Sequence, residues 1–223
     1  QDPAGGCLQR LEVPAHRQKL VAQPPAFTRV VDAAQPLPLP GTGGWGVAGV
    51  DPAALSDGDD PHELKYTHFS VKVSAKRRLP LFSAVNIDGA KSDRTVKRTN
   101  VWRFDPRIGR EFQILDGVYG NDKEGFFSRG HMTRREDPNW GDKKTAKQAD
   151  ADTFHATNAC PQRQSFNGGI WLSLEDYILD NTDQENIRIS VITGPVFQED
   201  DPVYYDVPIP LEFWKVVVFT NAA

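Results

Sequence analysis

A single histidine, His131, lies in a stretch that is dense in charge, residues 126–141 with the sequence FFSRGHMTRREDPNWG. Arg129 stands two residues before it, and Arg134 and Arg135 follow it closely. Histidine suits general base catalysis because its unperturbed pKa of about 6.5 leaves it largely neutral at pH 7. Arginine keeps its charge and presents a planar fork of donors to a phosphate oxygen. The stretch is therefore either a solvated charged turn or part of a centre that cleaves phosphodiester bonds.

A second stretch, FHATNACPQRQSFNGGIWLSLEDY, supplies the oxygen donors that a metal-assisted phosphodiesterase needs. It contains Asn158, Asn167 and Glu175. On an ideal helix, the step from Asn167 to Glu175 advances about 12 Å and rotates about 80°, so both side chains cannot easily bind one ion directly. A Mg²⁺ ion held by Asn167, with Glu175 contacting one of its waters, fits this spacing because Mg²⁺ commonly keeps several waters.

The two stretches together resemble the DNA/RNA non-specific endonucleases, the endonuclease G-like family of ββα-metal or His-Me finger nucleases. The usual pattern of that family is DRGH followed by N-x-x-PQ, FN, W and LE. This sequence has SRGH and then NACPQRQSFNGGIWLSLED, in the same order. A four-residue motif alone is weak evidence, but both blocks at this separation are specific. The resemblance covers residues 66–220 and implies an α+β fold, in which a central antiparallel sheet carries flanking helices.

The resemblance also implies a role for each matching residue. His131 becomes the general base that activates water, and Asn167 becomes the direct ligand of Mg²⁺, with Mn²⁺ as an alternative ion. Glu175 contacts a water of that ion. Asn158 supports the histidine, and Arg129 neutralises charge on the phosphate.

Four further arginines are candidates for contacts to the substrate. The family uses an upstream arginine at the phosphate, and Arg98 or Arg103 can take that place. Arg134 and Arg135 either touch the nucleic-acid backbone or form an exposed pair balanced by neighbouring acids. Between residues 76 and 110, ten Lys or Arg stand against three Asp, which is typical of either a solvated face or a surface that binds nucleic acid.

Ser128 is the departure from the family pattern, because most members have aspartate at this place. A carboxylate so near the base would favour the imidazolium form, and serine removes that negative charge. We therefore expect activity to begin at a lower pH than in a Ser128→Asp variant.

These residues predict a metal-dependent nuclease that hydrolyses DNA and RNA with little sequence preference, because its contacts go mainly to phosphates. DNA and RNA are the expected partners, and no membrane partner is expected. A homodimer and either a secreted or an intracellular location stay open. Two alternatives remain. One is a degenerate nuclease fold that only binds nucleic acid or protein, and the other is a toxin or effector module of a larger polypeptide.

The elements that position the site follow from apolar patterns. Short alternating runs predict strands at residues 66–74, 81–89, 153–158, 187–194 and 213–219. Ile170, Leu174 and Ile178 recur every four residues and predict a helix, for which Asn167 is a suitable N-cap. His155 is expected to be a packed histidine of the strand at 153–158.

Amino-acid composition and the positions of the prolines predict the domain organisation. Residues 1–61 hold nine of the 17 prolines and no sustained periodicity, which indicates an arm or linker before a nuclease domain at 62–223. Apolar residues such as Trp45 allow that arm to pack on the domain. No apolar run approaches the roughly 20 residues that cross a bilayer. The sequence starts with Gln1 rather than Met, which indicates a processed or truncated product.

The two cysteines, Cys7 and Cys160, show no CxxC spacing and do not decide the compartment. Cys160 is expected to be a small buried thiol rather than a redox or metal-binding group.

Overall fold

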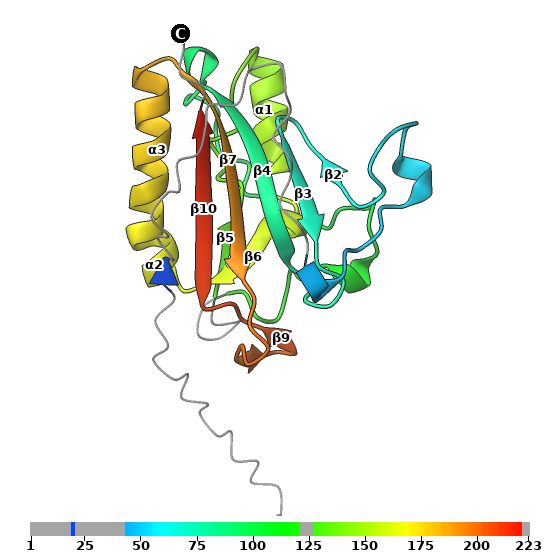
Figure 1. Ribbon diagram of the computed structural model, residues 1–223. Helices are drawn as coiled ribbons and strands as arrows, with labels where there is room; N and C mark the ends of the chain where they lie inside the picture. Colours follow the sequence, from blue (N-terminus) through cyan, green and yellow to red (C-terminus); the bar gives the residue numbers. More distant parts are fainter. Residues whose placement is uncertain (1–18, 21–42, 121–126, 220–223) are drawn as a thin grey trace, which may run out of the picture.

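The computed structural model describes residues 19–20, 43–120 and 127–219. Its central element is a six-stranded sheet with the strand order β1-β10-β7-β4-β3-β2 (Figure 1). All neighbours from β10 to β2 pair antiparallel, and β1 pairs parallel with β10. The predicted α+β class with a central antiparallel sheet is therefore confirmed.

The strands of this sheet lie close to the places that alternation predicts. They are β1 (Lys19–Leu20), β2 (Leu64–Lys65), β3 (Phe69–Val73), β4 (Pro80–Asp88), β7 (Arg188–Val196) and β10 (Glu212–Phe219). In β3, Phe69, Val71 and Val73 are buried and the residues between them are less so, as expected for a strand with one face on the core. The predictions at 66–74, 81–89, 187–194 and 213–219 are confirmed.

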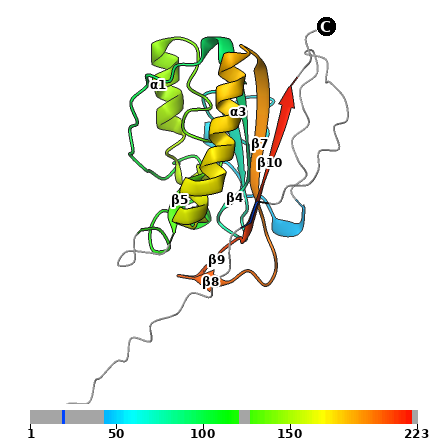
Figure 2. The ribbon, with the colours of Figure 1, turned by 90° about the vertical axis from the view of Figure 1, so that its left-hand side faces the viewer.

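Two helices and a hairpin cover one face of the sheet. The helices are α1 (Lys143–Asp152) and α3 (Leu172–Gln184), which is preceded by the short α2 (Gln164–Phe166) and a π turn (Asn167–Trp171). The hairpin consists of β5 (Ser128–His131) and β6 (Ala159–Gln162). Figure 2 shows both helices on the same side of the sheet, and Figure 1 shows β5 and β6 between α3 and α1. The hairpin thus lies in the layer between the two helices.

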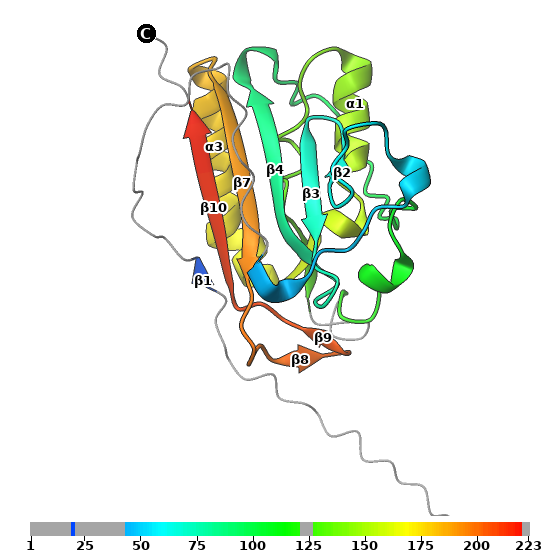
Figure 3. The same cartoon turned by 45° about the vertical axis from the view of Figure 1, so that its right-hand side comes forward.

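Smaller elements complete the described chain. A second hairpin joins β8 (Val203–Tyr204) and β9 (Val207–Pro208) at one end of β7 and β10 (Figure 3). The 3₁₀ turns are Gly43–Trp45, Pro52–Ala54, Gly89–Lys91, Arg110–Phe112 and Ala156–Asn158. Within the described ranges, no helix has the length and apolar character that crossing a bilayer requires.

The predicted strand at 153–158 is wrong. Helix α1 ends at Asp152, a 3₁₀ turn occupies Ala156–Asn158, and the strand β6 begins only at Ala159. Every residue from 153 to 158 is buried. The apolar residues here are therefore explained by burial on all sides and not by a strand that has one solvent-exposed face. His155 is packed as expected, but in this turn and not in a strand.

The helix near residue 170 exists, but its predicted start at Asn167 is wrong. Its buried residues include Trp171, Glu175 and Leu179, whereas Ile170 is 62% exposed. Asn167 has helical φ and ψ of −59° and −46° and makes no capping bond, because the helical run already starts at residue 164. Glu175 consequently lies on the face of α3 that is turned to the core.

The segment at 43–61 packs on the sheet. Ala48 and Val50 are buried in the core, and the Trp45 ring lies 5.6 Å from that of Phe197. Most of the predicted arm lies outside the described residues, so the boundary at Pro61 stays a prediction. Cys160 is a buried free thiol, as expected, and Cys7 lies outside the described residues.

Candidate active site

The β5–β6 hairpin brings the two sequence motifs together. Ser128 pairs with Gln162, and His131 pairs with Ala159. Gly130 faces the side chain of Gln162, because a Cβ at position 130 would lie 2.0 Å from Gln162 Oε1 and 2.6 Å from its Cγ. Gln162 is fully buried and has little room to move away. The glycine of SRGH and the glutamine of CPQ are therefore one packing unit.

His131 lies at the end of β5 against two aromatic rings. The centroid of its imidazole is 4.7 Å from that of Trp102 and 5.1 Å from that of Phe154, which meets it edge to face. Its Nε2 atom is buried and has no hydrogen-bond partner among the described residues. Burial lowers the pKa of His131 to about 3, and the charges of Arg98 and Arg135 add to this effect. The imidazole is therefore neutral at pH 7 and can accept a proton.

Asn158 fixes the backbone that follows the histidine. Its Oδ1 accepts a hydrogen bond from the Thr133 N–H at 2.8 Å, and its Nδ2 donates to the carbonyl oxygens of Thr133 and Thr153 at 2.9 and 3.0 Å. The Asn158 carbonyl also accepts from the Met132 N–H at 2.9 Å. Because the residue is fully buried and its carboxamide is occupied, it holds the backbone next to His131, and its support of the histidine stays a prediction.

The two predicted metal-site residues, Asn167 and Glu175, lie on the helical segment that packs against this hairpin. Trp171, midway between them, belongs to the same core cluster as Met132 and Ala159. The Asn167 side chain is partly exposed and has no hydrogen-bond partner among the described residues. Its amide oxygen is thus available to a ligand.

The carboxylate of Glu175 is buried. Burial raises the pKa of Glu175 to about 7, although the positive charge of Lys215 opposes the rise. Its Oε1 atom forms an ion pair with Lys215 Nζ at 3.4 Å. Within the described chain, no three His, Cys, Asp or Glu side chains gather around one point. An amide oxygen assisted by one carboxylate suits a hard ion that keeps most of its waters, so the donors present fit Mg²⁺.

Arg98 is the predicted phosphate-binding residue that the structure leaves most available. It is exposed, and within the described ranges it forms no ion pair and one hydrogen bond, from Nε to Asn100 Oδ1 at 3.4 Å. Its guanidinium carbon lies 5.2 Å from the centroid of Phe154, the ring that also contacts His131. Arg98 and His131 thus flank the same aromatic side chain.

Two other predicted arginines are held by protein groups. Arg129 donates from Nε and Nη2 to the Leu115 carbonyl oxygen at 3.2 and 2.8 Å. Arg103 donates to His155 Nε2 at 3.0 Å and lies 3.8 Å from Asp152 Oδ1. A contact of either residue to a phosphate stays a prediction, and it would have to compete with these partners.

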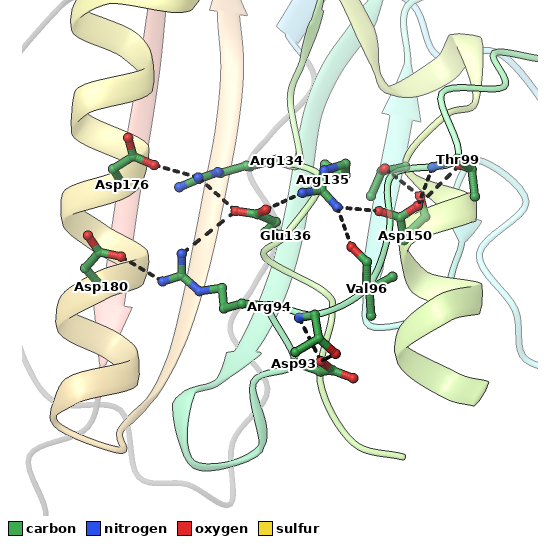
Figure 4. A network of polar contacts seen from close by, with 12 residues as sticks. Asp93, Arg94, Val96, Thr99, Arg134, Arg135, Glu136, Asp150, Asp176 and Asp180 are labelled. Carbon is green, nitrogen blue, oxygen red and sulfur yellow. Dashed lines mark hydrogen bonds and ion pairs between the residues drawn. The ribbon is translucent and has the colours of Figure 1, made fainter. Parts of the chain in front are cut away.

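Arg134 and Arg135 do not form an exposed pair, so that alternative is wrong. Their side chains are only 12% and 17% exposed. Both donate to Glu136, while Arg134 Nη2 also lies 2.6 Å from Asp176 Oδ1 and Arg135 Nη1 lies 2.8 Å from Asp150 Oδ1 (Figure 4). Their predicted contact with nucleic acid stays a prediction.

These ion pairs connect the segment after His131 to both helices. Asp150 belongs to α1 and Asp176 to α3. Arg94 extends the chain of contacts, because its Nη2 lies 2.8 Å from Asp180 Oδ1 and its Nη1 lies 3.8 Å from Glu136 Oε2 (Figure 4). Arg134 and Arg135 therefore join the segment after His131 to α1 and α3.

Sequence reasoning missed Lys215 as a residue of this region. Its side chain is 2% exposed and faces Glu175 from strand β10. A signal was present in the sequence, because Lys215 shares the strand phase of Phe213 and Val217, where an apolar residue is expected.

The comparisons with known proteins agree with the motifs. The sequence profile of one family, described as DNA/RNA non-specific endonuclease, matches residues 53–223. The uncharacterised protein y4fB of Sinorhizobium fredii is 42% identical over 192 residues, which are 83% of this chain and 29% of that protein. The mitochondrial nuclease EXOG of Danio rerio is 28% identical over 166 residues, 69% of this chain and 46% of that protein. The chain thus spans less than half the length of these curated relatives.

The fold also resembles a solved structure. A chain in the crystal structure of the EndoG/EndoGI complex superimposes with a TM-score of 0.56 at 23% sequence identity. The superposition covers 71% of this chain and 67% of that chain.

Proposed function

Because this chain belongs to the DNA/RNA non-specific endonuclease family, we propose that it hydrolyses phosphodiester bonds in DNA and RNA with His131 as the general base. The observation that carries the proposal is the place of the imidazole, which is neutral at pH 7 and contacts Phe154, the ring that Arg98 also contacts. It ends the hairpin that joins SRGH to NACPQ. A positioned base of this kind contributes about 10²- to 10⁴-fold to a rate.

Arg98 would hold a non-bridging oxygen of the phosphate. Its charge is one cause of the low pKa of His131, so the single negative charge of a phosphodiester beside it would offset that charge. The substrate would thereby raise the basicity of the imidazole when a proton must be taken from water. The expected products carry 5′-phosphate and 3′-hydroxyl ends, as the family resemblance implies.

The donor set around α3 supports a divalent ion, and metal dependence is typical of the family. Asn167 would be the direct ligand, and Glu175 would contact a water of the ion. When bound, Mg²⁺ would supply positive charge for the phosphate and for the departing oxygen. The protein's own contribution is to hold these donors next to the hairpin that carries His131.

Removal of the metal is expected to stop cleavage. Purified protein with Mg²⁺ should nick and linearise supercoiled plasmid, and excess EDTA should lower the rate by more than about 100-fold, since the ion offsets charge that only the transition state develops. Adding Mg²⁺ beyond the EDTA should restore the rate. Gel analysis of circular and linear substrates measures this and separates endonucleolytic from exonucleolytic cutting. Binding of plasmid without any cleavage would favour the degenerate fold.

Replacing Ser128 with aspartate is expected to shift the acid limb of the pH–rate profile to higher pH. The direction follows because a carboxylate favours the imidazolium form of His131, which cannot act as a base. The expected shift of the acid limb is small, because three residues of strand separate positions 128 and 131 by about 10 Å. At that distance in water, Coulomb's law gives roughly 0.4 kcal/mol, which corresponds to about 0.3 pKa unit. The Ser128 hydroxyl has two acceptors within reach of its single proton, the Gln162 carbonyl at 3.0 Å and Gln164 Oε1 at 2.9 Å.

The neutral control for this experiment is Ser128→Asn, which has nearly the shape of aspartate. Its acid limb should match that of the wild type, and both limbs should fall well below pH 6.5 because the pKa of His131 is low. Equal limbs for the Asp and Asn variants, or a shift of the Asp variant to lower pH, would reject the hypothesis.

A further inference from the structure

A lysine with a buried side chain, Lys215, lies next to the helix that carries the proposed metal donors. Only 2% of its side chain is exposed, although lysine is almost never buried without a partner. Strand β10 brings it there from the other end of the sequence, more than 80 residues beyond His131. Its burial therefore calls for a compensating group on the elements that pack against β10.

Three groups surround the ammonium of Lys215. Nζ donates to Thr193 Oγ1 at 2.8 Å, lies 4.9 Å from the centroid of the Trp171 ring, and lies 3.4 Å from Glu175 Oε1. Thr193 belongs to the neighbouring strand β7, and Trp171 and Glu175 belong to the helical segment. The hydroxyl and the ring thus hold the ammonium in place, and Glu175 is its negatively charged neighbour.

The charge of Lys215 also reaches the segment that follows His131. Burial raises the pKa of Asp137 to about 6, and Lys215 is the first of the charges that oppose this rise. Burial likewise raises the pKa of Glu175, and the charge of Lys215 opposes that rise. Two buried carboxylates from different segments therefore share one buried cation, and of the two only Glu175 is close enough for an ion pair.

We propose that Lys215 is a positioning residue that fixes the Glu175 carboxylate for its contact with a water of the divalent ion. This inference rests on the proposed function. Helix geometry alone does not fix Glu175 relative to Asn167, because a π turn with non-helical angles at Gly169 interrupts the run between them. The Lys215 ammonium, which β7 and β10 hold in place, can fix the position of the Glu175 carboxylate relative to the sheet.

The test is Mn²⁺ binding to the full chain, measured from the electron paramagnetic resonance signal of free Mn²⁺, with no substrate present. Lys215→Met keeps the length of the side chain and removes its charge. It should weaken Mn²⁺ binding about 10- to 100-fold, the range found when partners of metal-site residues are lost. Loss of the Lys215 charge alone should strengthen Mn²⁺ binding, because two nearby cations repel each other. Unchanged or tighter Mn²⁺ binding therefore overturns the proposal.

A double-mutant cycle separates positioning from a general effect on the fold. In a Glu175→Gln background, Lys215→Met should change Mn²⁺ affinity by less than about twofold, because the group that Lys215 acts on is already gone. A further tenfold loss in that background means that Lys215 does not act through Glu175. Should Lys215→Met fail to fold, Thr193→Val removes only one hydrogen bond of the ammonium. That variant should weaken Mn²⁺ binding at least threefold, and unchanged binding would contradict the proposal.

Arg77→Met is the matched control, because it also removes a buried cation. Arg77 pairs with Asp201 at 3.1 Å, and their side chains are 4% and 1% exposed. The variant should lower thermal stability and leave Mn²⁺ affinity unchanged. If the wild-type protein binds no Mn²⁺ at all, the proposed metal dependence fails together with this inference. If the wild type binds Mn²⁺ and Lys215→Met binds it equally well, only the inference fails.

Discussion

His131→Ala is expected to abolish cleavage of DNA and RNA while leaving nucleic-acid binding nearly intact. The loss should be at least about 10²- to 10⁴-fold, the contribution of a positioned general base. Binding should persist because Arg98 and the metal donors do not depend on the imidazole for their place. Within the described part of the chain the His131 ring makes no hydrogen bond, and its contacts to Trp102 and Phe154 are aromatic packing. Plasmid cleavage in Mg²⁺ and fluorescence anisotropy with labelled DNA measure the two quantities.

The control for this variant is His62→Ala. His62 is exposed, and among the described residues its ring makes one polar contact, at 3.4 Å to the Ala48 carbonyl oxygen. Its rate should stay within about twofold of the wild type. A His131→Ala protein that still cuts plasmid at nearly the wild-type rate would show that the base has been assigned to the wrong residue.

Asn158→Ala is expected to lower both stability and activity. The substitution leaves the Thr133 N–H, the Thr133 carbonyl and the Thr153 carbonyl without their buried partner. Each such group costs about 1–3 kcal/mol, and the three are not additive, so we expect the free energy of unfolding to fall by about 3 kcal/mol. Urea unfolding measures this loss. The nuclease rate per folded molecule should also fall, because Thr133 is two residues from His131.

Asn139→Ala is the control for the loss of a buried carboxamide. Asn139 is 2% exposed, but neither polar atom of its side chain has a hydrogen-bond partner among the described residues. Its removal leaves no group unpaired, so the free energy of unfolding should fall by less than that of Asn158→Ala. Equal losses for the two variants would contradict the role that the structure gives to Asn158.

The family could be predicted from the sequence because its signal is local. SRGH and NACPQRQSFNGGIWLSLED specify residue types at fixed spacing, and the profile match over residues 53–223 confirms the family that they indicate. The strands of the sheet were predictable for a similar reason, since alternation of apolar and polar residues reports a strand with one face on the core.

Two helical features could not be predicted from periodicity. Helix α1 has no apolar stripe, because its buried residues include Ala146, Ala149 and Asp150, and its start is set by the Asp142 cap. In the helical run of 164–184, the buried row is Trp171, Glu175 and Leu179, and the carboxylate in this row hides it from a search for apolar periodicity. In both cases the buried face is chosen by what packs against it.

The sequence by itself determined the family, the main strands and the candidate residues of the site, because these depend on residue types and short spacing. Only the tertiary structure decided which charged groups are available. Arg134, Arg135 and Lys215 have partners 42, 15 and 40 residues away along the chain, whereas Arg98 keeps an exposed guanidinium near His131. The physical reason is that ion pairing and desolvation depend on distance and enclosure in space, and sequence separation specifies neither.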